Sequence, residues 1–66
     1  MANNIRDQAR RKIEQANNLL DSTGQHLAWI EATYREQHPE IADCMLIAMH
    51  TLGETIQYLT LVRESF

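Results

Sequence analysis

The sequence predicts an all-α protein: an antiparallel two-helix hairpin that dimerises into a four-helix bundle. Apolar residues recur every three or four positions along most of the 66 residues, which is typical of one face of a helix. The single proline, Pro39, separates two such periodic segments. A chain this short has a marginal core. It holds one cysteine and no cluster of metal-ligand residues, so self-association is the remaining means of stabilisation.

The first segment keeps a heptad repeat, the pattern of a helix packed along a seam. One core position holds Ile13, Leu20, Leu27 and Tyr34, and the other holds Ala9, Ala16, Thr23 and Ile30. Gly24 follows Ser22 and Thr23 and would suit a turn, but the heptad continues in register after it. We therefore predict a helix over about residues 4–37 that passes through Gly24 at a cost of up to about 1 kcal/mol.

His38-Pro39 marks the break between the two segments. Proline disfavours the α conformation of the residue before it and suits the first position of a helix. We predict a turn at 38–39 and a second helix over about 40–65, so that residues 1–66 form one hairpin domain. Its two core positions hold Met45, Leu52, Leu59 and Phe66, and Ile41, Ala48, Thr55 and Val62, flanked by Ala42, Met49 and Ile56. A polar stripe of Asp43, His50, Gln57 and Glu64 is expected to face solvent.

Several large apolar residues fall outside this seam and would be exposed in a monomer. Exposed apolar patches usually mark an interaction surface, although scattered exposed apolar residues are also common. We expect a homodimer or a larger ring of hairpins, with aromatic side chains as anchors. The predicted interface residues are Trp29, Leu46, Ile47, Tyr58 and Leu61.

A small and polar layer is predicted halfway along the hairpin. With the turn at 38–39, residues whose numbers add to about 77 lie side by side, so Gly24 faces Gly53. Thr23 and Thr55 lie within about one turn of them. One interpretation is close helix approach, with threonine hydroxyls bonded to their own helix carbonyls. The other is a pocket for a small polar ligand between hairpins.

The start of the chain is basic although the formal net charge is −3. Arg6, Arg10, Arg11 and Lys12 lie where a helix dipole favours acidic residues, which makes them candidates for binding an anion. The alternative is a solvated helix start. The rest of the chain is acidic, which disfavours binding to nucleic acid.

The sequence argues against several other classes of protein. The three histidines lack the helical spacing of a metal face, and a narrow apolar seam offers no concavity for catalysis. We therefore expect no enzyme activity, no cofactor and no metal. No apolar run approaches the roughly 18 residues that span a bilayer, and no secretory signal is present. We expect a cytoplasmic protein, in the host cytoplasm if a phage encodes it.

Ala42-Asp43 after the turn, with His50 and Leu61 in the second helix, resembles the Rop family of plasmid copy-number regulators, as do the length and the proline-marked turn. This resemblance implies a dimeric helical hairpin that holds paired RNA stem-loops. Arg6 and Arg10 would then lie in the RNA-contacting helix.

Two further segments resemble bacterial or phage proteins. The run Ile47-Ala48-Met49-His50-Thr51-Leu52, continued by Glu54, Ile56 and Leu59, is similar to the last helix of phage proteins that sequester cyclic nucleotide signals of bacterial defence. The run from Glu14 to Leu20, with Met49-His50, is similar to short pseudomonad proteins of unknown role. These resemblances imply a bacterial or phage source.

The expected function is that of a small non-enzymatic interaction protein that self-associates and regulates or inhibits a partner protein. The first alternative is an oligomeric sponge that sequesters an anionic cyclic nucleotide and so blocks anti-phage signalling. The second is a Rop-like RNA-binding regulator.

Overall fold

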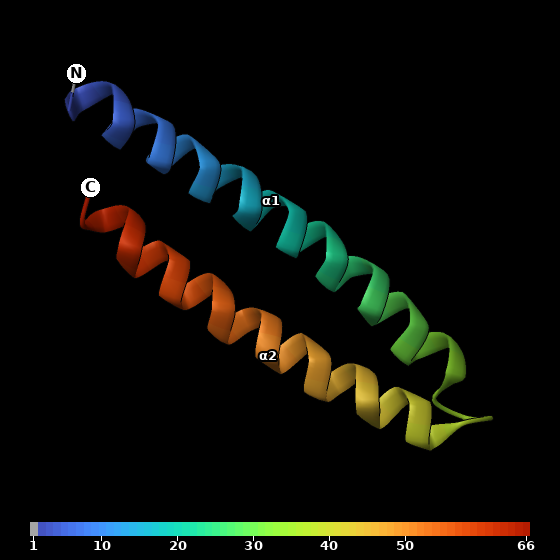
Figure 1. The fold of residues 1–66 in the computed structure, drawn as a ribbon. Helices are drawn as coiled ribbons and strands as arrows, with labels where there is room; N and C mark the ends of the chain where they lie inside the picture. Colours follow the sequence, from blue (N-terminus) through green and yellow to red (C-terminus); the bar gives the residue numbers. More distant parts are fainter. Residues whose placement is uncertain (1) are drawn as a thin grey trace.

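The chain folds into two long helices that lie side by side and run in opposite directions (Figure 1). The computed structural model describes the backbone of residues 2–66 and the side chains from residue 4 onward. Helix α1 spans Ala2–Tyr34, with 33 residues, and α2 spans Pro39–Glu64, with 26 residues. The molecule is a rod of 55 × 15 × 10 Å with both termini at one end. The predicted all-α two-helix hairpin is confirmed.

Helix α1 runs through Gly24 without a break, and neither glycine has a positive φ angle. At 1.5 Å per residue, α1 is about 50 Å long and α2 about 39 Å. The Arg10 guanidinium donates a hydrogen bond to the carbonyl oxygen of Phe66. Residues before Arg10 therefore extend beyond the end of α2, as the pairing of residue numbers predicts.

The turn begins earlier than the proline alone suggests. Helix α1 ends at Tyr34, three residues before the expected end near Gln37, and the last bond of its helical ladder joins the His38 N–H to the Tyr34 carbonyl oxygen at 2.8 Å. His38 has φ −138° and ψ 73°, outside the α region, as the residue before proline requires. Pro39 then occupies the first turn of α2.

Arg35 closes the turn from the side of α1. Its Nε donates to Glu31 Oε2 and its Nη1 to Asp43 Oδ1, both at 2.7 Å. The hydrogen bonds to Asp43 and then to Glu31 raise the pKa of Arg35 above its ordinary value. The side chain thus joins the last turn of α1 to the first turn of α2.

The seam between the helices is narrow, and Ala42 is the single fully buried residue among those described. On α2 the half-buried residues are Met45, Ala48, Met49, Leu52, Thr55, Ile56 and Leu59. Met49 and Ile56, expected on the flank, thus share the seam with Ala48 and Thr55 of the predicted core. Ile41, Val62 and Phe66, expected in the core, are 37%, 46% and 36% exposed. Two helices pack along a single line of contact, so residues about 80° around the helix axis from that line remain partly exposed.

A similar shift occurs on α1. Ile13, Leu20 and Leu27 are half-buried as predicted, but Thr23 and Tyr34 are exposed. Ala9, Ala16 and Ile30 are half-buried as well, and the seam extends to the residues that follow Ala16, Thr23 and Ile30 in the chain, which are Asn17, Gly24 and Glu31. The structure thus rotates both helices slightly from the expected phase. One side of the predicted core therefore lies at the margin of the seam, where Ala16, Ile30 and Ala48 are half-buried and Val62 is exposed.

Candidate functional site

The described residues include many large hydrophobic side chains that the hairpin does not cover. All five predicted interface residues are among them: Trp29 is 65% exposed, Ile47 and Tyr58 are each 68%, Leu61 is 61% and Leu46 is 48%. Ile5 and Leu19 on α1 are exposed to a similar degree. Their exposure is a finding, and their role in an interface stays a prediction.

One side of the seam is tied by ion pairs, and we call it the ion-paired face. Arg63 Nη2 lies 2.8 Å from Glu14 Oε1, and Arg35 joins Asp43 near the turn. Glu14 and Arg35 are three heptads apart and so lie on the same side of α1. In each ion pair the two residue numbers add to 77 or 78. Both ion pairs could therefore be predicted from the rule that residues whose numbers add to about 77 lie side by side.

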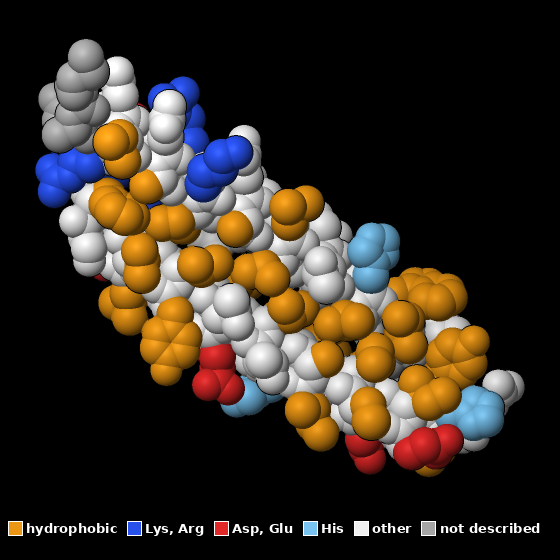
Figure 2. Space-filling model, viewed as in Figure 1, with side chains coloured by type: hydrophobic (Ala, Val, Ile, Leu, Met, Phe, Trp, Pro, Cys, Tyr) orange, Lys and Arg blue, Asp and Glu red, His pale blue; other side chains and the backbone are white. Residues whose placement is uncertain are grey.

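The opposite side of the seam, which we call the apolar face, is nearly uncharged. Its edges consist of small, apolar and threonine residues: Ala9, Ala16, Thr23 and Ile30 on α1, and Ile41, Ala48, Thr55 and Val62 on α2. The next position outward holds Lys12, Leu19, His26 and Thr33 on α1, and Cys44, Thr51, Tyr58 and Ser65 on α2. Lys12 is the lone formal charge in these four series. Figure 2 looks onto this face, where hydrophobic side chains run the length of both helices.

In the structure the glycines and the threonines of the predicted layer do not form one site. Gly24 and Gly53 line one shallow hollow of about 320 Å³, together with Asp21, Gln25 and apolar residues of the seam. Thr23 and Thr55 are not part of its lining. Their hydroxyls donate to carbonyl oxygens of their own helices, Thr23 to Leu19 at 2.8 Å and Thr55 to Thr51 at 2.9 Å.

The two glycines are not required for the packing of α1 on α2. A Cβ atom built at Gly53 meets nothing within 4 Å, and one at Gly24 meets only Leu52 Cδ1 at 4.0 Å. The interpretation of close helix approach within the hairpin is therefore wrong at these positions. The threonine half of that interpretation agrees with the hydrogen bonds.

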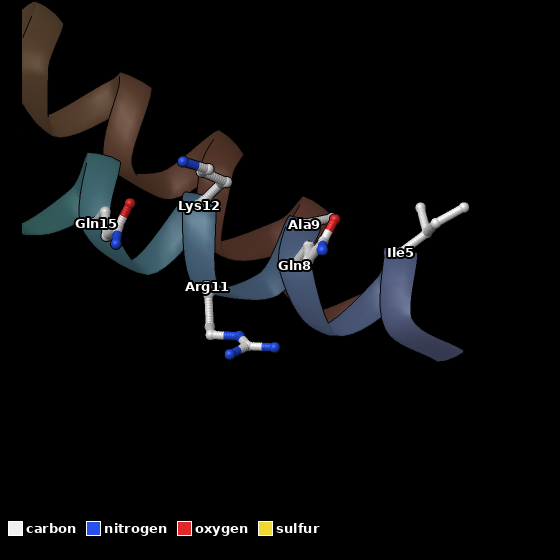
Figure 3. A pocket seen from close by; sticks show the side chains of 6 residues that line it. All are labelled: Ile5, Gln8, Ala9, Arg11, Lys12 and Gln15. Carbon is white, nitrogen blue, oxygen red and sulfur yellow. The ribbon is translucent and has the colours of Figure 1, made fainter. Parts of the chain in front are cut away.

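The basic residues at the start of α1 do not converge on one point. Arg10 is bonded to Phe66, and Arg11 Nε lies 3.4 Å from the Asp7 carbonyl oxygen. A hollow lined by Ile5, Gln8, Ala9, Arg11, Lys12 and Gln15 lies on α1 (Figure 3). Within it Arg11 and Lys12 extend from opposite sides of the helix. The arrangement gives this end a diffuse positive charge.

The remaining polar residues make short-range contacts. His50 Nε2 lies 3.1 Å from Glu54 Oε1, and His38 Nδ1 lies 3.4 Å from Glu40 Oε1. Cys44 is a free, exposed thiol. Within the described residues no three histidine, cysteine or acidic side chains gather closely enough to hold a metal ion. No described helix has an apolar stretch long enough to cross a bilayer.

The heptad pattern does not predict one of the polar residues in the seam. Asn17 is half-buried, and its Oδ1 is a buried acceptor without a hydrogen-bond partner among the described residues. A polar residue directly after the core residue Ala16 is the sequence signal that could have indicated it.

Searches of protein-family models, of curated proteins and of solved structures found no match to this chain. The Rop-like and anti-defence resemblances therefore rest on the quoted residues, and the structure supports the helical hairpin that they share.

Proposed function

We propose that this chain is a small non-enzymatic interaction protein that self-associates and docks on a partner protein to regulate or inhibit it. The observation that supports this most directly is the ratio of exposed to buried hydrophobic residues. Eleven large hydrophobic side chains are at least 36% exposed, whereas Ala42 is the one buried hydrophobic residue described. Surfaces of this kind generally mark protein interfaces.

The small size of the hairpin also favours self-association. Burial of apolar surface contributes roughly 25 cal/mol per Å², and two helices that meet along one line bury little of it. Small domains of this length usually need a further source of stability. A second hairpin on the apolar face would cover Ile30, Ala48 and Val62 and would complete a four-helix bundle.

Three of the predicted interface residues lie elsewhere and suit a different partner. Ile47 and Leu61 are two heptads apart on the side of α2 that faces away from α1, and Trp29 faces away from α2 on α1. They are 68%, 61% and 65% exposed. In a dimer formed through the apolar face they would stay accessible. We assign these two opposite edges of the hairpin to contacts with the partner protein, with Trp29 as the aromatic anchor on α1.

The test separates the two kinds of contact. Trp29→Ala with Leu61→Ala should leave the oligomer intact and abolish capture of the partner in a pull-down. Val62→Glu with Ala48→Glu should dissociate the oligomer in sedimentation experiments. Gln57→Ala, on the exposed polar stripe, is the matched control and should change neither. The proposal fails if the Trp29 and Leu61 substitutions leave both self-association and partner capture unchanged.

The two alternative functions gain no specific support from the geometry. Asp21 lines the hollow that contains both glycines, and its charge opposes an anionic nucleotide. Arg11 and Lys12 point apart, which provides no focused site for phosphate groups. Native mass spectrometry of protein purified gently from cells would support the cyclic-nucleotide sponge if the oligomer carried a non-protein ligand.

A further inference from the structure

We propose that the second copy packs on the apolar face in an antiparallel orientation, so that the open end of each hairpin lies beside the turn end of the other. The open end comprises residues 4–14 and 60–66, and the turn end comprises residues 31–43. This inference rests on the proposed self-association and adds the arrangement of the two copies. It follows from the distribution of charge along the rod.

The open end is positive. It holds three carboxylates and five cations, a formal charge of +2. Those cations are Arg6, Arg10, Arg11, Lys12 and Arg63. In Figure 2 the Lys and Arg side chains gather at this end of the molecule.

The turn end is negative. Arg35 is its one cation, and four carboxylates give it a formal charge of −3. Those carboxylates are Glu31, Glu36, Glu40 and Asp43. The middle of the hairpin holds only Asp21 and Glu54. The two ends of the hairpin therefore carry net charges of opposite sign, and the middle, with a formal charge of −2, is negative like the turn end.

The two ends act independently because they are far apart. Residues 12 and 34 of α1 are separated by about 33 Å along the axis, several times the Debye length of about 8–10 Å at physiological salt. A second copy with its open end beside the first open end would bring like charges together at both ends of the bundle. The antiparallel copy brings opposite charges together at both.

The apolar face itself does not choose between these orientations. Its four residue series carry small or apolar groups and hydroxyls along their length, with His26 near the middle and Lys12 at the open end as the one formal charge. Threonine hydroxyls at 23, 51 and 55 are bonded within their own helices. Apolar burial thus supplies affinity for either orientation, and the end charges select one of them.

The two-fold axis of the antiparallel dimer crosses the rod at the level of Gly24 and Gly53, halfway between the turn and the open end. Each copy then presents the same face to the other, as a closed two-fold dimer requires. Cys44 lies nine residues from this level, so the two Cys44 residues would be about 27 Å apart along the axis. Thr51 lies two residues from it, so the two Thr51 residues would be separated by about 6 Å along the axis.

Charge reversal tests the orientation. Arg11→Glu with Lys12→Glu reverses part of the open end, and Glu36→Lys with Glu40→Lys reverses part of the turn end. Each pair alone should weaken the dimer about tenfold at low salt, and the four substitutions together should restore it. Circular dichroism of each variant checks that the helices persist. The wild-type dimer should weaken as salt rises.

Cross-linking gives an independent measurement. A short bismaleimide should link Thr51→Cys in a Cys44→Ser background and should leave wild-type Cys44 unlinked, although both positions belong to the same heptad series. Equal cross-linking of the two would overturn the orientation, as would a four-fold variant no tighter than the two-fold ones. A chain that stays monomeric at every salt concentration would instead overturn self-association and with it the proposed function.

Discussion

The two helices share one seam but differ in what they leave outside it. Helix α1 is polar around most of its circumference. Its exposed large hydrophobic residues are Ile5, Leu19, Trp29 and Tyr34. Helix α2 is shorter, yet it exposes Ile41, Leu46, Ile47, Tyr58, Leu61 and Val62. The second helix therefore carries apolar groups on several sides of its axis. A helix of that kind is usually covered on more than one side.

This difference indicates which helix is central to the assembly. Leu46 lies toward the ion-paired face, Tyr58 toward the apolar face, and Ile47 points away from α1. A second hairpin on the apolar face covers only one of these directions. Helix α2 thus has the larger apolar surface left for a further partner, whereas α1 presents mainly charge and amide groups around the exposed Trp29. The following substitutions test the comparison between the two helices.

The largest effect is expected at Ala42, where α2 is in closest contact with α1. Ala42→Leu adds bulk to the one site with 0% exposure and should lower the free energy of unfolding by about 1–3 kcal/mol. Ala32→Leu, on the exposed side of α1 near the same end, is the matched control and should be close to neutral. Denaturant titration followed by circular dichroism measures both. Equal effects would show that the seam does not dominate the stability.

A gain is expected at the polar residue that α1 contributes to the seam. Asn17→Leu removes a buried acceptor without a described partner and adds apolar contact, so it should raise the free energy of unfolding by about 1–2 kcal/mol. Asn18→Leu, at the exposed neighbouring position, should change it little. A loss of stability in Asn17→Leu would indicate that Asn17 is bonded to a group outside the hairpin.

Each helix contains one glycine, so the same substitution can be made and compared in both helices. Gly53→Ala and Gly24→Ala should each raise the free energy of unfolding by roughly 0.5–1 kcal/mol, because alanine lowers the entropy of the unfolded chain and both sites have room for a Cβ. Thermal unfolding at several protein concentrations measures this and separates it from changes in association. A weaker oligomer in either variant would place that glycine in a contact between copies.

The smallest effect is expected for the ion pair that joins the helices at the open end. Glu14→Gln or Arg63→Gln should lower the free energy of unfolding by about 0.2–1 kcal/mol, since both side chains are nearly half exposed. A double-mutant cycle isolates the coupling, which should decrease with added salt. A coupling that salt does not change would mean that the pair is shielded from solvent by another chain.

Much of the fold follows from local rules that the sequence displays. Pro39 cannot continue a helix from His38, so the position of the turn could be predicted. The unbroken heptad across Gly24 outweighed the turn preference of one glycine. Trp29, Ile47 and Leu61 could be placed outside the seam because their spacing does not match it. These features depend on residues near one another in the chain or on the period of the helix.

The rotation of each helix about its axis depends on both helices together. On α2 two adjacent stripes, one with Ile41, Ala48, Thr55 and Val62 and one with Ala42, Met49 and Ile56, satisfy the same periodicity. The heptad pattern predicts that the first is a core position and that the second flanks it. In the structure Ala42 is fully buried, and Met49 and Ile56 are half-buried together with Ala48 and Thr55. The bond from Arg35 to Asp43 spans the turn and likewise depends on both segments together.

The sequence by itself therefore determined two helices, their break and their antiparallel order, since periodicity and proline chemistry act locally. Only the tertiary structure decided which side of the hairpin is tied by ion pairs and which is left apolar. The physical reason is that a helix with apolar groups on several sides can pack through any of them. The choice is made by contacts with the other helix, including Glu14 with Arg63 and Arg35 with Asp43.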